Sequence, residues 1–313
     1  MTTKPGAAYW EGRLRLTCIL LDASVLNPNG YFEEFPKRTV IPGGMVLAAL
    51  GETESRRISS RLHVQRPPRW RIEMFDIESD DADELSAIVR HRFNLLCCAQ
   101  RSAPSVLALL DRFTGGAWRR VCPVAEISGS GRGVFLDEER LEAWGEIVAA
   151  WPSGLDDRIA ISLEFFRESV AERQVSLSKS LLTLAVAFES LIGQDLKAEL
   201  NFRLSQRAAF LVSNGPASHR VMVRMKDLYG ARSSLVHGGR KASPDAVTKL
   251  QQFMMRAIPS MARLSEVAGG FKGANQILDK APFGLDPILR DVVSPKGEAW
   301  WARVDVCKIP GWL

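Results

Sequence analysis

The sequence contains no apolar run long enough to cross a membrane and no pattern that would hold a metal or a disulfide. None of its 313 residues belongs to a stretch of about 18 or more apolar residues, and the first six lack the apolar core of a secretion signal. The cysteines are odd in number and scattered, without a CxxC pair, so we expect buried free thiols. They are Cys18, Cys97, Cys98, Cys122 and Cys307. These absences predict a cytoplasmic protein that needs no membrane, metal or cofactor.

Positive charge is concentrated in one window of the chain. From residue 195 to 241 there are nine basic residues and three acidic ones, a net charge of +6; because the whole chain carries +5, the remainder carries −1. Such an excess is typical of a site for a polyanion, although an ordinary solvated face can have the same composition. The basic residues that we predict to contact an RNA backbone are Arg203, Arg207, Arg220, Arg224, Arg240 and Lys241.

Up to residue 135 the hydrophobic pattern predicts a mixed α/β domain, residues 1–135. Residues 13–19 and 69–74 alternate polar and apolar side chains, as half-buried strands do. Residues 81–100 and 104–113 are expected to be helices. The glycine-rich segment at 128–133 indicates a linker at the end of this domain.

After this linker the apolar residues follow the spacing of amphipathic helices. Stripes with intervals of three and four residues run through 141–151, 159–170, 177–191, 200–211, 221–235 and 247–264. Short connections between such helices favour an up-and-down bundle, which we assign to residues 136–268. Residues 269–313, rich in proline and tryptophan, are expected to form an irregular or short-strand tail packed on the body. The predicted fold class is therefore α+β.

The most informative segment is 229–239, in which an arginine and a histidine are followed by two glycines. Arg232 can brace a phosphate, and His237 can move a proton near neutral pH. Gly238 and Gly239 predict the end of the helix, so His237 falls in its last turn, where the helix dipole favours a protonated imidazole. At about 100° per residue, Arg232 and His237 point roughly 140° apart on one helix. They could flank a groove or meet a second copy across a symmetric interface, and a surface arginine beside a helix-end histidine would look the same.

Three segments resemble a known family. Residues 187–193 read Ala-Phe-Glu-Ser-Leu-Ile-Gly, 200–204 read Leu-Asn-Phe-Arg-Leu, and 228–238 read Leu-Tyr-Gly-Ala-Arg-Ser-Ser-Leu-Val-His-Gly. They are similar to the Ala-Leu-Glu-x-Leu segment, the following arginine-bearing helix and the Tyr-x-x-Arg-Ser-x-x-x-His-Gly signature of HEPN domains (higher eukaryote and prokaryote nucleotide-binding), most of all in the Apea-like branch. The resemblance covers about residues 156–266, and residues 1–135 resemble nothing that we identify.

The resemblance implies a metal-independent endoribonuclease that acts as a homodimer, in a defence or toxin system, and leaves a 2′,3′-cyclic phosphate. On that template His237 exchanges protons and Arg232 stabilises the charge on the phosphorane. Relatives often carry a more polar residue directly after the arginine, where this chain has Ser233. Many HEPN domains bind without cutting, so the alternative is a non-catalytic module for a nucleotide, RNA or a partner protein. A regulatory partner, if the protein has one, is not identified by the sequence.

Two residues outside the arginine–histidine pair are predicted to support the site, together with Ser233. Glu189 lies at the border of the apolar stripe of its helix, where it could pair with Arg203, Arg207 or Arg232 and orient it, tune His237, or simply fix helix packing through a half-buried ion pair. Tyr229 could stack on a base, cap the groove or pack against the core.

Overall fold

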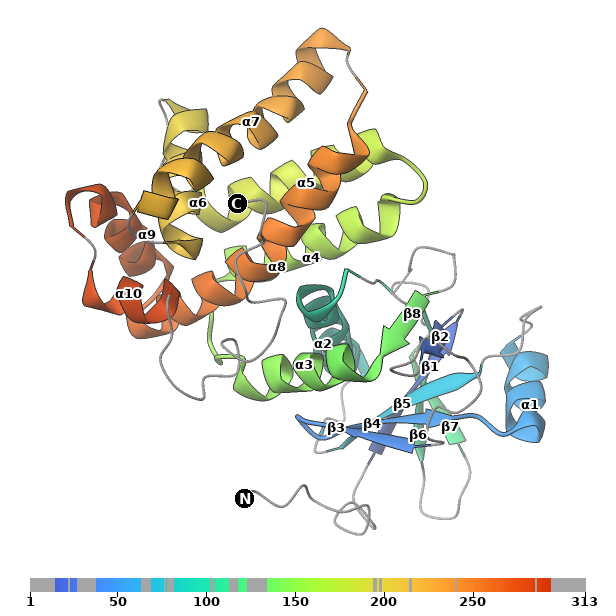
Figure 1. Cartoon of the computed structure of the whole chain (residues 1–313). Helices are drawn as coiled ribbons and strands as arrows, with labels where there is room; N and C mark the ends of the chain where they lie inside the picture. The colour runs from blue at the N-terminus through green and yellow to red at the C-terminus, as the bar shows by residue number, and fades with distance from the viewer. Residues whose placement is uncertain are drawn as a thin grey trace. The chain divides into compact units, whose positions relative to one another are not determined.

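The computed structural model describes most of the chain in two compact units (Figure 1). The described residues are 15–21, 23–26, 38–62, 69–75, 77, 82–101, 103, 105–112, 118–122, 134–193, 196, 199–213, 216–239, 241–284 and 286–293. Residues 1–93 and 102–149 form the first unit, and residues 94–101 and 150–313 form the second. Apart from residues 94–101, the second unit begins after residue 149, later along the chain than the predicted boundary at residue 135. The glycine-rich segment at 128–133 lies outside the described residues.

The first unit is built on an antiparallel sheet with the strand order β3-β4-β5-β1-β6-β7. These strands are β1 (Arg15–Leu21), β3 (Arg38–Ile41), β4 (Met45–Ala49), β5 (Trp70–Phe75), β6 (Ser105–Arg112) and β7 (Trp118–Cys122). A separate parallel pair joins β2 (Ala23–Leu26) to β8 (Val134–Asp137). The strands predicted at 13–19 and 69–74 are confirmed as β1 and β5.

Three helices lie between or after these strands in the sequence: α1 (Glu52–Leu62), α2 (Ala82–Ala99) and α3 (Glu138–Ala150). Phe93 of α2 and Trp144 of α3 pack with their ring centroids 5.5 Å apart, and both are fully buried. The Trp144 indole Nε1 donates a hydrogen bond of 2.7 Å to the Arg92 carbonyl, so this ring is buried without losing its polar partner. The helix predicted at 81–100 is confirmed.

The helix predicted at 104–113 is wrong, because these residues form strand β6. This strand is hydrogen-bonded on both sides, to β1 and to β7. A short apolar run such as Val-Leu-Ala-Leu-Leu suits a central strand as well as a helix, and periodicity alone cannot separate the two. Pairing with strands distant in the sequence decides the conformation.

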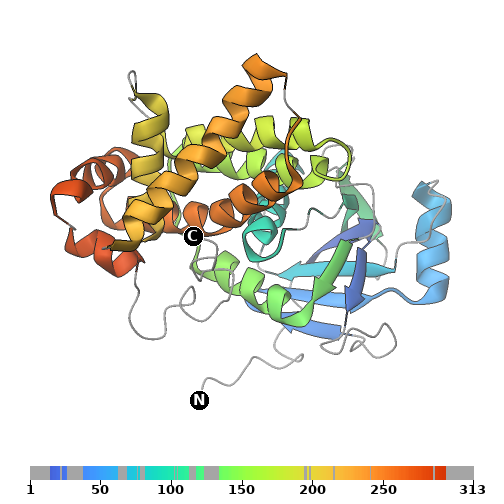
Figure 2. The ribbon, with the colours of Figure 1, turned by 45° about the horizontal axis from the view of Figure 1, so that its top comes forward.

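All the regular secondary structure described in the second unit is helical (Figure 2). Its elements are α4 (Asp157–Glu172), α5 (Leu177–Ile192), α6 (Leu200–Val212), α7 (Pro216–Gly238), α8 (Pro244–Val267), α9 (Phe271–Lys280), the 3-10 turn η2 (Ala281–Phe283) and α10 (Pro287–Val293). Ser176 and Ser243 cap α5 and α8, each accepting a hydrogen bond from a backbone N–H in the first turn. Leu181, Leu184 and Phe188 are fully buried, which confirms the predicted stripe of α5. The chain thus combines an antiparallel sheet with predominant helices in an α+β fold.

The irregular tail expected after residue 269 is wrong for residues 271–293. Phe271, Ala274 and Leu278 are buried at intervals of three and four residues, so α9 presents one apolar face to the bundle. Pro282 and Pro287 fall at the starts of η2 and α10, where a proline fits a helix, rather than inside one. No helix among the described residues is both long and apolar enough to cross a membrane.

Candidate functional site

The arginine–histidine motif lies on an end of α7 that the bundle does not cover. One stripe of the helix is buried: Ser218, Val221, Met225 and Tyr229. From residue 230 to 239 no residue is buried, and both views show this end of α7 rising away from α5 and α8 (Figures 1 and 2). Arg232 and Val236, three and seven positions after Tyr229, continue the buried stripe past the point where its partners end. Val236 is 53% exposed for this reason.

One carboxylate oxygen of Glu189 on α5 contacts both Tyr229 and Arg232 of α7. The Tyr229 hydroxyl donates a hydrogen bond of 2.6 Å to Glu189 Oε1. The same oxygen lies 3.5 Å from Arg232 Nε, and the Arg232 guanidinium carbon lies 5.8 Å from the centroid of the Tyr229 ring. Among the three arginines that the sequence left open for Glu189, the structure selects Arg232.

This contact reaches Arg232 from one edge only. The Arg232 side chain keeps 40% of its surface exposed, and its Nη1 and Nη2 donate no hydrogen bond to any residue that the structure describes. A guanidinium binds a carboxylate or a phosphate in a planar fork. Glu189 therefore fixes the Nε edge, while the two terminal nitrogens keep their capacity for a second oxyanion.

Tyr229 is a packed side chain rather than an exposed ring for base stacking. Its ring lies 5.6 Å from that of Phe188, and the residue is 5% exposed. Burial raises the pKa of the Tyr229 hydroxyl well above its ordinary value, the Glu189 carboxylate raises it further, and Arg232 offsets part of this increase. The hydroxyl consequently stays protonated and keeps donating to Glu189 across the neutral pH range.

His237 is exposed in the last turn of α7, as the two glycines predicted. Gly239 follows the helix with a φ of +61°, a left-handed conformation that a side chain would strain. None of the described residues forms a hydrogen bond or an ion pair with the imidazole. Because Arg232 and His237 belong to one continuous helix, their side chains leave it roughly 140° apart. One chain alone places the two groups on different sides of α7.

The other predicted site residues separate into exposed and buried positions. Ser233, Arg220, Arg224 and Lys241 are exposed, and Arg203 is partly exposed. Arg240 lies outside the described residues.

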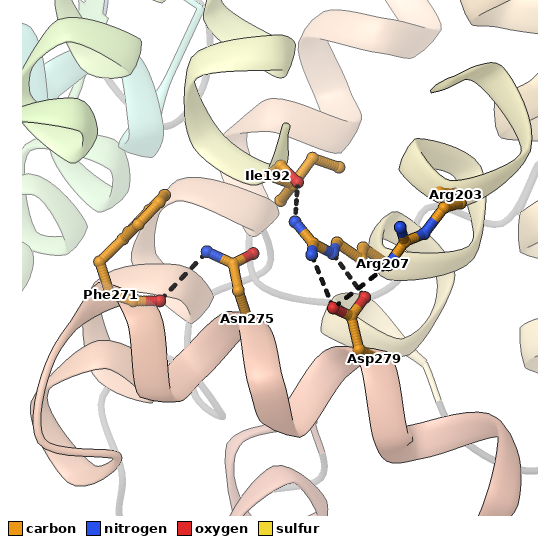
Figure 3. Close-up of polar contacts among 6 residues, drawn as sticks. All are labelled: Ile192, Arg203, Arg207, Phe271, Asn275 and Asp279. Carbon is orange, nitrogen blue, oxygen red and sulfur yellow. Dashed lines mark hydrogen bonds and ion pairs between the residues drawn. The ribbon is translucent and has the colours of Figure 1, made fainter. Parts of the chain in front are cut away.

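Arg207 is buried, so the prediction that it contacts RNA requires correction. Its Nε and Nη2 donate hydrogen bonds of 2.8 and 2.7 Å to the two carboxylate oxygens of Asp279 on α9, and its Nη1 donates one of 2.7 Å to the Ile192 carbonyl at the end of α5 (Figure 3). Arg203 lies 3.5 Å from the same carboxylate. Arg207 on α6 therefore links α5 and α9 through these hydrogen bonds. Sequence reasoning missed Asp279 because it assigned residues 269–313 to an irregular tail.

Removing Asp279 is expected to destabilise the second unit. Asp279→Ala leaves the Arg207 charge buried without its carboxylate, which costs about 3 kcal/mol in comparable buried pairs. Denaturant unfolding measures this loss, and the exposed Asp291→Ala on α10 is the matched control. An Asp279→Ala protein as stable as the Asp291→Ala protein would show that the contact between Arg207 and Asp279 does not stabilise the second unit.

The contact between Arg207 and Asp279 also makes the free energy of unfolding depend on pH. Burial alone would raise the pKa of Asp279, but the Arg207 hydrogen bonds and the charges of Arg207 and Arg203 outweigh it and lower the pKa. The stabilisation is thus complete above the ordinary carboxyl pKa of about 3.9 and is lost as the pH falls through the lower folded value. Asp279→Asn should remove this part of the acid dependence.

No model of a known protein family matches the chain, and no curated protein or solved structure matches it either. Within the described parts of the chain, no group of three or more His, Cys, Asp or Glu side chains could hold a metal ion.

Proposed function

We propose that the chain is a HEPN-type endoribonuclease in which Arg232 and His237 act on one phosphodiester without a metal. The observation that carries the proposal is the state of Arg232: Glu189 holds its Nε edge, and the terminal nitrogens of a half-exposed guanidinium have no described hydrogen-bond acceptor. A cation held in this way is ready for a phosphate, because little side-chain freedom remains to be lost on binding.

The proposed reaction uses the substrate's own hydroxyl as the nucleophile. The ribose 2′ oxygen attacks the adjacent phosphorus, and the bond from phosphorus to the 5′ oxygen of the next nucleotide breaks. A neutral His237 accepts the 2′-OH proton, and a protonated His237 gives a proton to the leaving oxygen, so the products are a 2′,3′-cyclic phosphate and a 5′-OH. Arg232 stabilises the negative charge of the five-coordinate phosphorane through its Nη atoms.

Two histidines and a closed phosphate site require a second copy of the chain. On one helix Arg232 and His237 point in different directions, whereas a two-fold axis beside α7 brings a second motif against the first. Exposed apolar residues next to the Glu189–Arg232 pair support this arrangement: Val236 on α7, and Leu182 and Val186, which precede Glu189 by seven and three positions on the same side of α5. The proposed active form is a homodimer.

The splayed motif also favours a second candidate function, a module that binds RNA or a nucleotide without cutting it. Such a module needs only the exposed basic residues and no convergence of Arg232 with His237. Cleavage separates the two functions, because both predict binding and only the first predicts product.

The purified protein is expected to cut RNA, but not DNA of the same sequence, with equal rates in EDTA and in Mg²⁺. DNA lacks the 2′-OH that the mechanism uses, and the proposed groups are all side chains. Gel analysis of labelled oligonucleotides measures cleavage, and phosphatase resistance of the new 3′ end identifies the cyclic phosphate. Cleavage that depends on added Mg²⁺, or cleavage of DNA, would contradict the mechanism.

RNA affinity is expected to fall steeply as salt increases, because bound cations release counterions from the phosphate backbone. Arg220 and Arg224 are exposed on α7, one turn apart, and changing both to Gln should flatten the logarithmic salt slope by about two. Fluorescence anisotropy at several salt concentrations measures the slope. An unchanged slope in the double variant would show that Arg220 and Arg224 do not contact the RNA backbone.

A further inference from the structure

Two arginines of the second unit meet a carboxylate in different ways. Arg207 donates hydrogen bonds from Nε and Nη2 to both carboxylate oxygens of Asp279, at 2.8 and 2.7 Å, which closes this edge of the planar guanidinium (Figure 3). Arg232 instead lies with its Nε at 3.5 Å from a single oxygen of Glu189, Oε1. None of the described residues forms a hydrogen bond or an ion pair with Glu189 Oε2. The contact between Arg232 and Glu189 is therefore open.

This open contact needs a restraint that burial does not supply. The side chains of Arg232 and Glu189 are 40% and 32% exposed, so both have room to rotate into the shorter two-point contact. That contact is the strongest geometry between a guanidinium and a carboxylate, and it occupies at least one of the terminal nitrogens that would meet a phosphate. A carboxylate beside a phosphate-binding arginine thus competes with the ligand unless its position is fixed.

Tyr229 supplies a fixed hydrogen-bond donor to this carboxylate. Its hydroxyl donates a hydrogen bond of 2.6 Å to Glu189 Oε1, whereas the same oxygen lies 3.5 Å from Arg232 Nε. The ring is held in the bundle, because its centroid lies 5.6 Å from that of Phe188, which in turn lies 5.7 Å from that of Phe253 on α8. A closed contact needs oxygens at about 2.8 Å from the guanidinium nitrogens. Glu189 would reach it only by moving away from a hydroxyl that cannot follow.

We propose that Tyr229 is a positioning residue: by holding Glu189, its hydroxyl keeps the terminal nitrogens of Arg232 open for an oxyanion. This inference rests on the proposed role of Arg232 as a phosphate ligand, and it adds a residue that does not touch the phosphate. Without the hydroxyl, the Glu189 carboxylate is released and closes on Arg232, as Asp279 closes on Arg207. The tyrosine thus prevents an inhibitory ion pair within the site.

The test measures the reactivity of the Arg232 nitrogens and needs no RNA. Phenylglyoxal modifies accessible guanidinium groups at their terminal nitrogens, and peptide mass spectrometry gives the rate at each arginine. The rate at Arg232 should fall about fivefold in Tyr229→Phe, because the closed ion pair blocks the reagent. It should return to the rate of the unsubstituted protein when Tyr229→Phe is combined with Glu189→Ala, which leaves no carboxylate to close. Arg224, exposed on the same helix, is the internal reference.

The direction of the change distinguishes positioning from packing. If Tyr229 only fastened α7 to α5, its loss would loosen the end of α7 and raise the rate at Arg232. Ser162→Ala is the matched control, because the Ser162 hydroxyl is also buried and donates a hydrogen bond of 2.7 Å to α5, but to the Ala187 carbonyl rather than to a carboxylate. The rate at Arg232 should be unchanged in this variant.

The outcomes separate this inference from the proposed function. An unchanged or raised rate in Tyr229→Phe, a fall that persists in the double variant, or an equal fall in Ser162→Ala would overturn the positioning role. If the expected rates are found in a chain that cuts no RNA, the ribonuclease is overturned and the positioning role stands. If the chain cuts RNA and Tyr229→Phe leaves the rate at Arg232 unchanged, the ribonuclease stands and the positioning role is overturned.

Discussion

Cleavage of RNA is expected to fall by at least about a hundredfold in both Arg232→Ala and His237→Ala. Arg232→Ala removes the cation whose terminal nitrogens are proposed to meet the phosphorane, and His237→Ala removes the group that carries protons to and from the oxygens. Single-turnover cleavage of a labelled RNA measures the loss, because it reports the chemical step without product release. Glu189 keeps its hydrogen bond from Tyr229 in the arginine variant, so the local structure retains one of its two contacts.

Two exposed residues outside the motif supply the controls. Arg290→Ala on α10 and His219→Ala on α7 change the same residue types at exposed positions, and each should retain cleavage within a few-fold. All four variants should melt close to the unsubstituted protein, since the changes are at solvent-accessible side chains, where substitutions usually alter stability by less than about 0.5 kcal/mol. Equal losses in the control and motif variants would mean that cleavage does not depend on the motif.

Val236→Asp is expected to convert the proposed dimer into a monomer and to abolish cleavage with it. Val236 is half-exposed on the stripe that continues from Tyr229 and Arg232, where a second copy is proposed to pack. An unpaired carboxylate enclosed there costs about 3 kcal/mol or more, which weakens association roughly a hundredfold. Light scattering coupled to gel filtration at micromolar concentration gives the mass, and the same fractions can be tested for cleavage.

Val175→Asp is the control for the dimer. Val175 is more exposed than Val236 but belongs to the turn between α4 and α5, so the charge should change neither mass nor activity. An unsubstituted protein that is already monomeric, or a monomeric Val236→Asp protein that still cuts RNA, would refute the shared site and favour the binding module.

The parts of the structure that could be predicted from the sequence are those that local spacing determines. The stripe of α5, the Ser243 cap of α8 and the end of α7 before Gly239 each depend on residues a few positions apart. The strand β6 and the burial of Arg207 depend on partners distant in the chain, and no local pattern marks them. Arg207 illustrates the limit: its neighbours in sequence predict a basic ridge, whereas its carboxylate partner lies 72 residues later on α9.

For the candidate site, too, the sequence predicts the local features and not the contacts between distant residues. The segment from Tyr229 to Gly239 identified the helix and its end, because helix spacing and glycine chemistry are local. The choice of Arg232 as the partner of Glu189 needed the packing of α5 against α7, since the sequence allowed two other arginines.

The uncovered end of α7 is expected to open and close independently of the rest of the helix. A helical segment without buried residues opens to solvent independently of the rest, so its amide hydrogens should exchange with deuterium much sooner than those around Tyr229. In the proposed dimer, part of the binding free energy orders the end of α7 beyond the Glu189–Arg232 contact, which lowers the net affinity. The activity of the proposed site therefore increases with the concentration of the second copy that completes it.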